Sequence, residues 1–160
     1  MPRKRPPTAT PPRLLIAEPA AAYRNRPPLV ADASVIAAAL FSEDGGDEAA
    51  ALLHGRDLHA PHLLDCEIAN VALKKHRRQD VPATTVISAL QTYARLPIER
   101  HAVDAAAVAV MAARFTLTAY DAAYLCVAEQ LAAPLATLDA KLAAAARACL
   151  AAEKEVHDGR

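Results

Sequence analysis

The sequence has no tryptophan, two phenylalanines and only four glycines among its 160 residues. So few large aromatic side chains favour a core of closely approaching helices over a β-sandwich. So little glycine argues against the glycine-rich phosphate loops of P-loop and Rossmann folds. Apolar residues, many of them alanine, still make up 54% of the chain, which is enough for an ordinary core in a single domain.

Charge and cysteine content exclude further classes. The 18 basic and 18 acidic residues cancel, so a polyanion would be bound through a local patch or a metal rather than by bulk attraction. The three cysteines are widely spaced and form no CxxC pair, which is typical of reduced thiols in a cytosolic protein. No apolar run reaches the roughly 18–20 residues of a membrane helix, and no secretory signal is evident. We therefore expect a cytoplasmic protein without a membrane segment.

Composition divides the chain into three parts. Residues 1–28 hold eight of the twelve prolines and six basic residues, so this segment cannot form a packed core of its own. We predict a disordered or extended arm there. A nucleic-acid-contacting tail, a loosely packed arm and sequence upstream of the true start are the alternatives. The folded domain is predicted at residues 29–152, followed by a short tail at residues 153–160.

Strands and helices alternate along the predicted domain. Short apolar runs bounded by turn residues predict strands at 29–33, 57–61, 96–101 and 134–139. Helices are predicted at 34–41, 46–55, 62–79, 82–94, 103–115, 120–131 and 140–152. Strands separated by helices pair in parallel through right-handed crossovers. The pattern therefore predicts an α/β fold of three layers, with helices on both faces of a parallel sheet.

Four acidic residues occupy positions where a site is expected. Asp32 and Asp139 end the first and fourth predicted strands, and ligands of open parallel sheets bind at the carboxyl ends of strands. Asp121 begins a helix inside the apolar stretch LTAYDAAYLC (117–126), and Glu67 lies within the long helix. Asp121 also has a simpler explanation, because a helix dipole favours negative charge in the first turn.

Carboxylates that converge need a cation. Two of them about 5 Å apart repel by about 3 kcal/mol at an effective dielectric constant of about 20. A ligand set made only of oxygen atoms suits a hard ion such as Mg²⁺, with Mn²⁺ as a substitute. Spacing alone leaves open whether the four acids meet.

Four segments resemble the motifs of PIN domains, and most closely those of VapC-type toxins from bacterial toxin–antitoxin pairs. They are LVADASV (29–35), PHLLDCEIANVALK (61–74), LTAYDAAYLCVAE (117–129) and LATLDAKL (135–142). The resemblance runs from Leu29 to about Ala152, and the motifs occur in order within the expected elements. The arm before Leu29 departs from the typical compact toxin.

The resemblance implies a PIN-like α/β/α fold with a parallel sheet of four to five strands, the first and fourth being neighbours. It places the family's catalytic, metal-binding acids on Asp32, Glu67, Asp121 and Asp139. It places residues that hold these carboxylates by hydrogen bonds on Ser34, Asn70 and Thr137. It further implies a Mg²⁺-dependent endoribonuclease that cleaves RNA, forms a homodimer and is inhibited by a small cognate, VapB-like antitoxin.

Two basic features have more than one interpretation. Lys74, Lys75, Arg77 and Arg78 end the long helix, and Lys141 follows Asp139 by two residues. They could contact RNA phosphates, which would make binding salt-dependent. For the first group, a solvated helix end whose dipole favours positive charge is the default interpretation, whereas for Lys141 the two interpretations are balanced.

Other chemistry receives less support. His59, His62 and Cys66 could form a zinc cluster, but their spacing is not that of a zinc finger. We expect instead that His62 starts the long helix and that Cys66 packs inside it. Two other functions compete with the toxin ribonuclease: a non-catalytic PIN-fold module that binds RNA or antitoxin, and a nuclease outside toxin–antitoxin biology. Acids at all four family positions favour an enzyme.

Overall fold

The computed structural model describes residues 26–42 and 45–158, and side chains as far as residue 150. Most of the predicted arm (1–25) and the end of the predicted tail (159–160) lie outside the described residues. The elements are β1 (Pro28–Ala31), α1 (Ala33–Phe41), α2 (Gly46–Leu53), β2 (Asp57–Pro61), α3 (Leu64–Arg78), α4 (Ala83–Tyr93), β3 (Ile98–His101), α5 (Ala105–Phe115), α6 (Ala119–Gln130), β4 (Leu135–Ala136) and α7 (Ala140–Asp158). Helix α7 thus continues past residue 152, where the sequence predicted its end.

All strands in the described part of the chain form one parallel sheet in the order β3-β2-β1-β4. The predicted α/β class and the parallel pairing are therefore confirmed, with four strands and with β1 beside β4. Strand β4 is shorter than its predicted span of 134–139, because the residues after Ala136 leave the sheet and turn toward β1. Asp32 directly follows β1, and its backbone N–H still pairs with the carbonyl of Ala136 at 3.0 Å.

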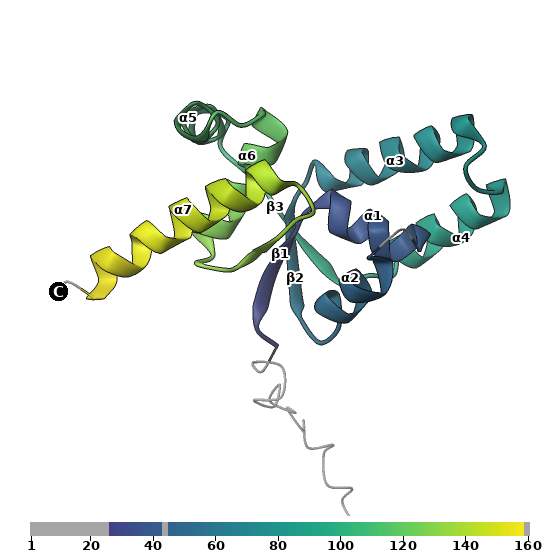
Figure 1. The fold of residues 1–160 in the computed structure, drawn as a ribbon, viewed down its shortest axis with the longest axis horizontal. Helices are drawn as coiled ribbons and strands as arrows, with labels where there is room; N and C mark the ends of the chain where they lie inside the picture. Colours follow the sequence, from purple (N-terminus) through teal and green to yellow (C-terminus); the bar gives the residue numbers. More distant parts are fainter. Residues whose placement is uncertain (1–25, 43–44, 159–160) are drawn as a thin grey trace, which may run out of the picture.

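Two groups of helices enclose the sheet (Figure 1). Helices α1 to α4 form one layer, in which α1 contacts α2, α3 and α4. On the other side, α6 packs against β1, β2 and β4, and α5 and α7 pack against α6. Helix α6 is therefore buried on most of its circumference, which explains why the stretch at 117–126 is so apolar.

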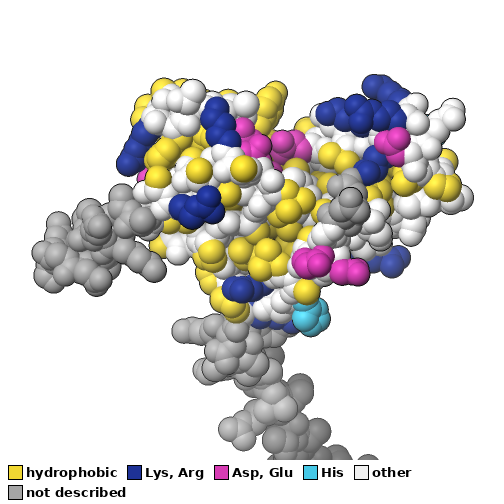
Figure 2. All heavy atoms as spheres, viewed as in Figure 1, with side chains coloured by type: hydrophobic (Ala, Val, Ile, Leu, Met, Phe, Trp, Pro, Cys, Tyr) yellow, Lys and Arg dark blue, Asp and Glu magenta, His cyan; other side chains and the backbone are white. Residues whose placement is uncertain are grey.

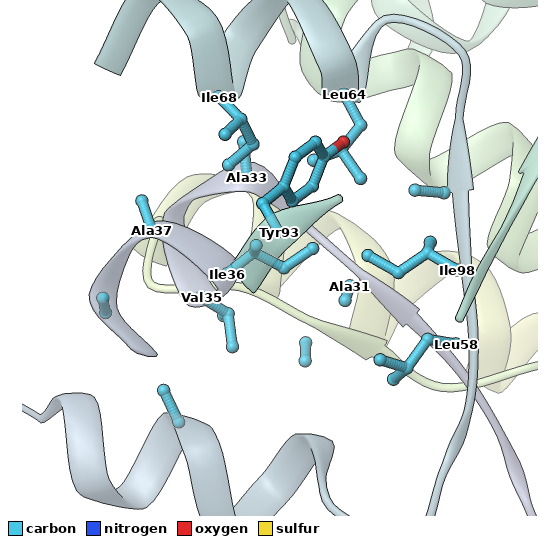
Figure 3. Packing of buried hydrophobic residues seen from close by; sticks show 14 of the residues in the cluster. Ala31, Ala33, Val35, Ile36, Ala37, Leu58, Leu64, Ile68, Tyr93 and Ile98 are labelled. Atoms are coloured by element: carbon cyan, nitrogen blue, oxygen red, sulfur yellow. The ribbon is translucent and has the colours of Figure 1, made fainter. Parts of the chain in front are cut away.

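Helix α3 is placed by a small apolar stripe and by a polar anchor. Leu64, Ile68 and Ala72 are spaced four residues apart and buried, and the first two pack against α1 and the sheet near Ile36 (Figure 3). The helix begins at Leu64 rather than at His62. The expectation that Cys66 packs inside the helix is wrong, because its side chain lies on the exposed face.

The polar anchor joins α3 to α4 and β3. Arg100 Nη2 and the Tyr93 hydroxyl both donate to Asp65 Oδ1, at 2.9 and 2.5 Å. The hydrogen bond from Arg100 lowers the pKa of Asp65, with a smaller lowering by Tyr93 and an opposing contribution from burial. Because Asp65 and Glu67 share the first turns of α3, this anchor fixes the helix segment that carries one of the predicted site acids. No helix in the described part combines the length and apolar character needed to cross a membrane.

Candidate metal centre

Asp32 is the most buried of the four predicted site acids, with 8% of its surface exposed. Ser34 Oγ donates to Asp32 Oδ2 at 2.6 Å, and Thr137 Oγ1 donates to the same oxygen at 2.8 Å. These neutral donors offset part of the cost of burying a carboxylate. No described residue donates a hydrogen bond to the other oxygen, Oδ1, which is thus available to a cation.

The loop from β4 to α7 brings Asp139 to the same edge of the sheet. The Asp139 backbone N–H donates to Thr137 Oγ1 at 3.0 Å, so one threonine hydroxyl contacts both Asp139 and Asp32. The Leu138 N–H donates to Ser34 Oγ at 3.0 Å and fastens the loop to the start of α1. Asp139 Oδ1 accepts from the Leu142 N–H at 2.8 Å, so this carboxylate caps α7 and retains a second oxygen.

Glu67 reaches the site from α3 and is held by α6. The hydroxyl of buried Tyr124 donates to Glu67 Oε2 at 2.5 Å. Burial raises the pKa of Glu67, and the negative charges of Asp32 and Asp121 raise it further, against the lowering effect of the Tyr124 hydrogen bond. No lysine, arginine or histidine among the described residues contributes to this shift. Glu67 therefore faces two other acids without a basic partner.

Asp121 is positioned by the residue that caps its own helix. Thr118 is the N-cap of α6, and its hydroxyl accepts from the Asp121 N–H at 3.1 Å while donating to Asp121 Oδ2 at 2.7 Å. Both explanations offered for this acid from the sequence therefore apply: the side chain sits in a first helical turn, and its charge also acts on Glu67.

The four acids lie where the two helical layers meet. Figure 2 shows acidic side chains gathered between the beginnings of α3 and α7. Among the described residues, no three of these carboxylates bring oxygen atoms within 4.8 Å of one another. Repulsion of about 3 kcal/mol between two carboxylates at 5 Å opposes closer approach unless a cation lies between them. An all-oxygen set with no basic partner at Glu67 fits a hard divalent cation better than a salt-bridge network.

Several predicted residues form no hydrogen bond with the four acids among the described residues. Asn70 is exposed on α3, and its side chain makes no hydrogen bond with any described residue. Arg77 and its basic neighbours end α3, about 15 Å along the helix axis from Glu67. Lys75 Nζ lies 5.2 Å from the centroid of the Phe41 ring, and Lys141 is exposed in the first turn of α7.

The sequence analysis missed two residues that hold the site acids. Thr118 could have been found from its spacing, because a threonine three residues before an acid at the start of a helix is a typical capping arrangement. Tyr124 could have been suspected because it lies one turn after Asp121 on α6. Its partner Glu67 is 57 residues away in the chain, so the hydrogen bond itself depends on how α3 and α6 pack.

Comparison with known proteins identifies the family of this fold. The sequence pattern of the PIN domain matches residues 29–148. The chain belongs to the PIN-domain family. Ribonuclease VapC9 of Mycobacterium tuberculosis is 39% identical over 71% of this chain and 87% of its own length. Ribonuclease VapC3 of Pyrobaculum aerophilum is 32% identical over 72% of this chain and 92% of its own length. The resemblance to VapC-type PIN proteins drawn from the four motifs is thus confirmed.

The raised pKa of Glu67 predicts how this PIN domain responds to pH and to metal. A carboxyl group whose pKa rises on folding adds stability below its unfolded-state pKa, and this stability is lost as pH rises through the folded-state pKa. Glu67→Gln keeps an acceptor for Tyr124 but removes the charge. We expect it to raise the unfolding temperature at pH 7 in EDTA and to reduce the stabilisation by excess Mg²⁺.

Differential scanning fluorimetry in EDTA and in Mg²⁺ measures both effects. Glu48→Gln, on the exposed side of α2, is the matched control and should leave the gain from Mg²⁺ unchanged. An unfolding temperature of Glu67→Gln below that of the unaltered protein in EDTA would contradict the electrostatic account.

Proposed function

We propose that this protein is a metal-dependent endoribonuclease and the toxin of a toxin–antitoxin pair. The observation that carries the proposal is the group of acids at the carboxyl edge of the sheet, with Glu67 facing Asp32 and Asp121 without a basic partner. Its relatives over most of the chain are named as VapC ribonucleases. A module that only bound RNA or antitoxin would gain nothing from keeping mutually repelling carboxylates together.

The proposed ligands are Asp32, Glu67, Asp121 and Asp139, and the proposed ion is Mg²⁺, with Mn²⁺ as a substitute. When bound, such an ion polarises a phosphate, stabilises a leaving oxygen and lowers the pKa of water. The chain's own contribution is to fix the ligands. Ser34 and Thr137 orient Asp32 through one of its oxygens, and Tyr124 and Thr118 orient Glu67 and Asp121.

The basic end of α3 supports RNA as the substrate. Lys74, Arg77 and Arg78 are exposed there, and Figure 2 shows Lys and Arg side chains gathered over this part of the surface. The distance of about 15 Å from Glu67 suits contacts to phosphates that flank the cleaved bond. Lys141 lies two residues after Asp139, at a helix start where the dipole disfavours positive charge. A contact with an RNA phosphate would explain a lysine at this position.

The proposal includes partners and a compartment. An apolar groove offers a surface to an antitoxin and is lined by Leu52 of α2, Leu138 of the loop before α7, and Leu150 of α7. Leu52 and Leu138 are 41% and 59% exposed, and large exposed apolar residues that cluster mark interaction sites.

We further propose a homodimer in the cytoplasm, where the three free cysteines stay reduced. Growth arrest on induction, relieved by a small reading frame encoded next to the gene, would support the toxin role.

Neutral replacement of the two acids at the sheet edge tests catalysis. Asp32→Asn and Asp139→Asn keep hydrogen-bond acceptors for Thr137 and for the α7 cap but remove charge. We expect each to lower the rate of Mg²⁺-dependent RNA cleavage by more than about 100-fold. Mutating a residue that only hydrogen-bonds to a metal ligand typically lowers metal affinity or activity by about 10–100-fold, and replacing a ligand itself should have a larger effect. Asp80→Asn, exposed beyond α3, is the control. Mapping RNA ends by sequencing after brief induction gives the substrate as well, and full activity of both variants would refute the assignment.

Charge reversal at the end of α3 tests the RNA contact. The triple variant Lys74→Glu, Arg77→Glu, Arg78→Glu leaves Lys75 on its aromatic partner. We expect weaker RNA binding and a salt dependence whose logarithmic slope falls by about 0.7 for each lost phosphate contact. Arg114→Glu on α5, in the opposite helical layer, serves as the control. Equal affinities of the triple variant and the unaltered protein across a salt series would assign these residues to a solvated helix end.

A further inference from the structure

Three side chains on β2 and β3 form a second cluster, separate from the acids. His59 is buried on β2, and Glu99 and His101 lie on the edge strand β3. In the strand register His59 pairs with Glu99, so the alternation of side chains places His101 on the same face. Among the described residues, this is the one group of three His, Cys, Asp or Glu side chains whose potential ligand atoms all lie within 4.8 Å of one another.

The spacing within the cluster suits a tetrahedral metal ion. His59 Nδ1 lies 3.0 Å from His101 Nε2 and 3.8 Å from Glu99 Oε2. His101 Nε2 lies 3.9 Å from Glu99 Oε1. Zinc–nitrogen and zinc–oxygen bonds of about 2.0–2.2 Å in a tetrahedron separate the ligand atoms by about 3.4 Å. The two carboxylate distances belong to different oxygens of Glu99. A small rotation of this exposed side chain would bring one oxygen toward both imidazoles, and the two nitrogens would move apart by a few tenths of an ångström.

The surroundings of His59 also match a metal-binding imidazole. Its other nitrogen, Nε2, lies 3.6 Å from Asp57 Oδ2. Histidines that bind metals usually direct their second ring nitrogen toward a carboxylate or carbonyl, which fixes the ring and leaves the first nitrogen as a ligand. Glu99 is 65% exposed at its side chain, so an ion can reach the cluster from solvent although His59 is buried.

We propose that His59 Nδ1, His101 Nε2 and the Glu99 carboxylate bind a zinc-like divalent ion at the sheet edge. Two imidazoles select Zn²⁺, Co²⁺ or Ni²⁺, whereas the all-oxygen set at the other site selects Mg²⁺ or Mn²⁺. Among the described strands, β3 pairs with β2 alone, and the ion would join these two strands by side chains as well. Binding therefore stabilises the folded state and holds the edge strand β3 against β2. The earlier grouping of His59 with His62 and Cys66 is replaced by partners that strand pairing supplies.

The test uses the full-length chain after removal of metals with EDTA. Isothermal titration calorimetry measures Zn²⁺ affinity, and the visible spectrum of bound Co²⁺ reports tetrahedral coordination. His101→Ala removes one ligand at a partly exposed position. Glu99→Gln weakens a second ligand, whose side chain is exposed. His62→Ala, an exposed histidine outside the cluster, is the matched control. Asp32→Asn separates this site from the acidic one, and circular dichroism verifies the fold of each variant.

We expect one Zn²⁺ per chain in the unaltered protein, in His62→Ala and in Asp32→Asn. Zn²⁺ affinity should fall by more than about tenfold in His101→Ala, because mutating a residue that only hydrogen-bonds to a metal ligand already lowers metal affinity by about 10–100-fold. Zn²⁺ affinity should fall in Glu99→Gln as well. Equal affinity in His101→Ala and His62→Ala would overturn the proposal and leave a hydrogen bond between two histidines. Loss of Zn²⁺ binding in Asp32→Asn, with retention in His101→Ala, would overturn it by assigning the ion to the acidic cluster.

Discussion

The hydrogen bonds that two hydroxyl groups donate to Asp32 hold together the edge of the sheet at which we propose the metal site. Ser34 comes from the helix that follows β1, and Thr137 comes from the loop that follows β4, yet both contact the same carboxylate oxygen. A short strand of two residues, β4, is thereby fixed beside β1. Because the donors are neutral, they orient the carboxylate without cancelling its negative charge.

Neutral hydrogen-bond donors also hold the other acids. Thr118 and Tyr124 bind Asp121 and Glu67 through hydroxyl groups, and Asp139 both caps α7 and presents its second oxygen. The negative charges of Asp32 and Asp121 raise the pKa of Glu67, so keeping these three carboxylates near one another opposes folding, and packing elsewhere compensates for that cost. Helix α6 contributes both to this packing and to the placement of the acids. Its buried residues fill the space between the sheet and α7, while Asp121 and Tyr124 face the site.

Much of this architecture was readable from the sequence, and the part that was not has a physical reason. The alternation of elements and the positions of Asp32 and Asp139 after strands follow from local patterns, so the fold class and its parallel sheet were predicted correctly. The length of β4 and the exposure of Cys66 depend on tertiary packing. The contact of Tyr124 with Glu67 and the pairing of His59 with His101 join residues 57 and 42 positions apart. No local pattern encodes such a register.

The central claim is that four separate carboxylates share a divalent ion at the carboxyl edge of the sheet. Anomalous diffraction from a crystal of the full chain soaked in Mn²⁺ measures this most directly, because the ion itself is located. The account predicts anomalous density among Asp32, Glu67, Asp121 and Asp139, absent in crystals of Asp32→Asn. Well-ordered carboxylates without that density at saturating Mn²⁺, or density that persists unchanged in Asp32→Asn, would contradict it.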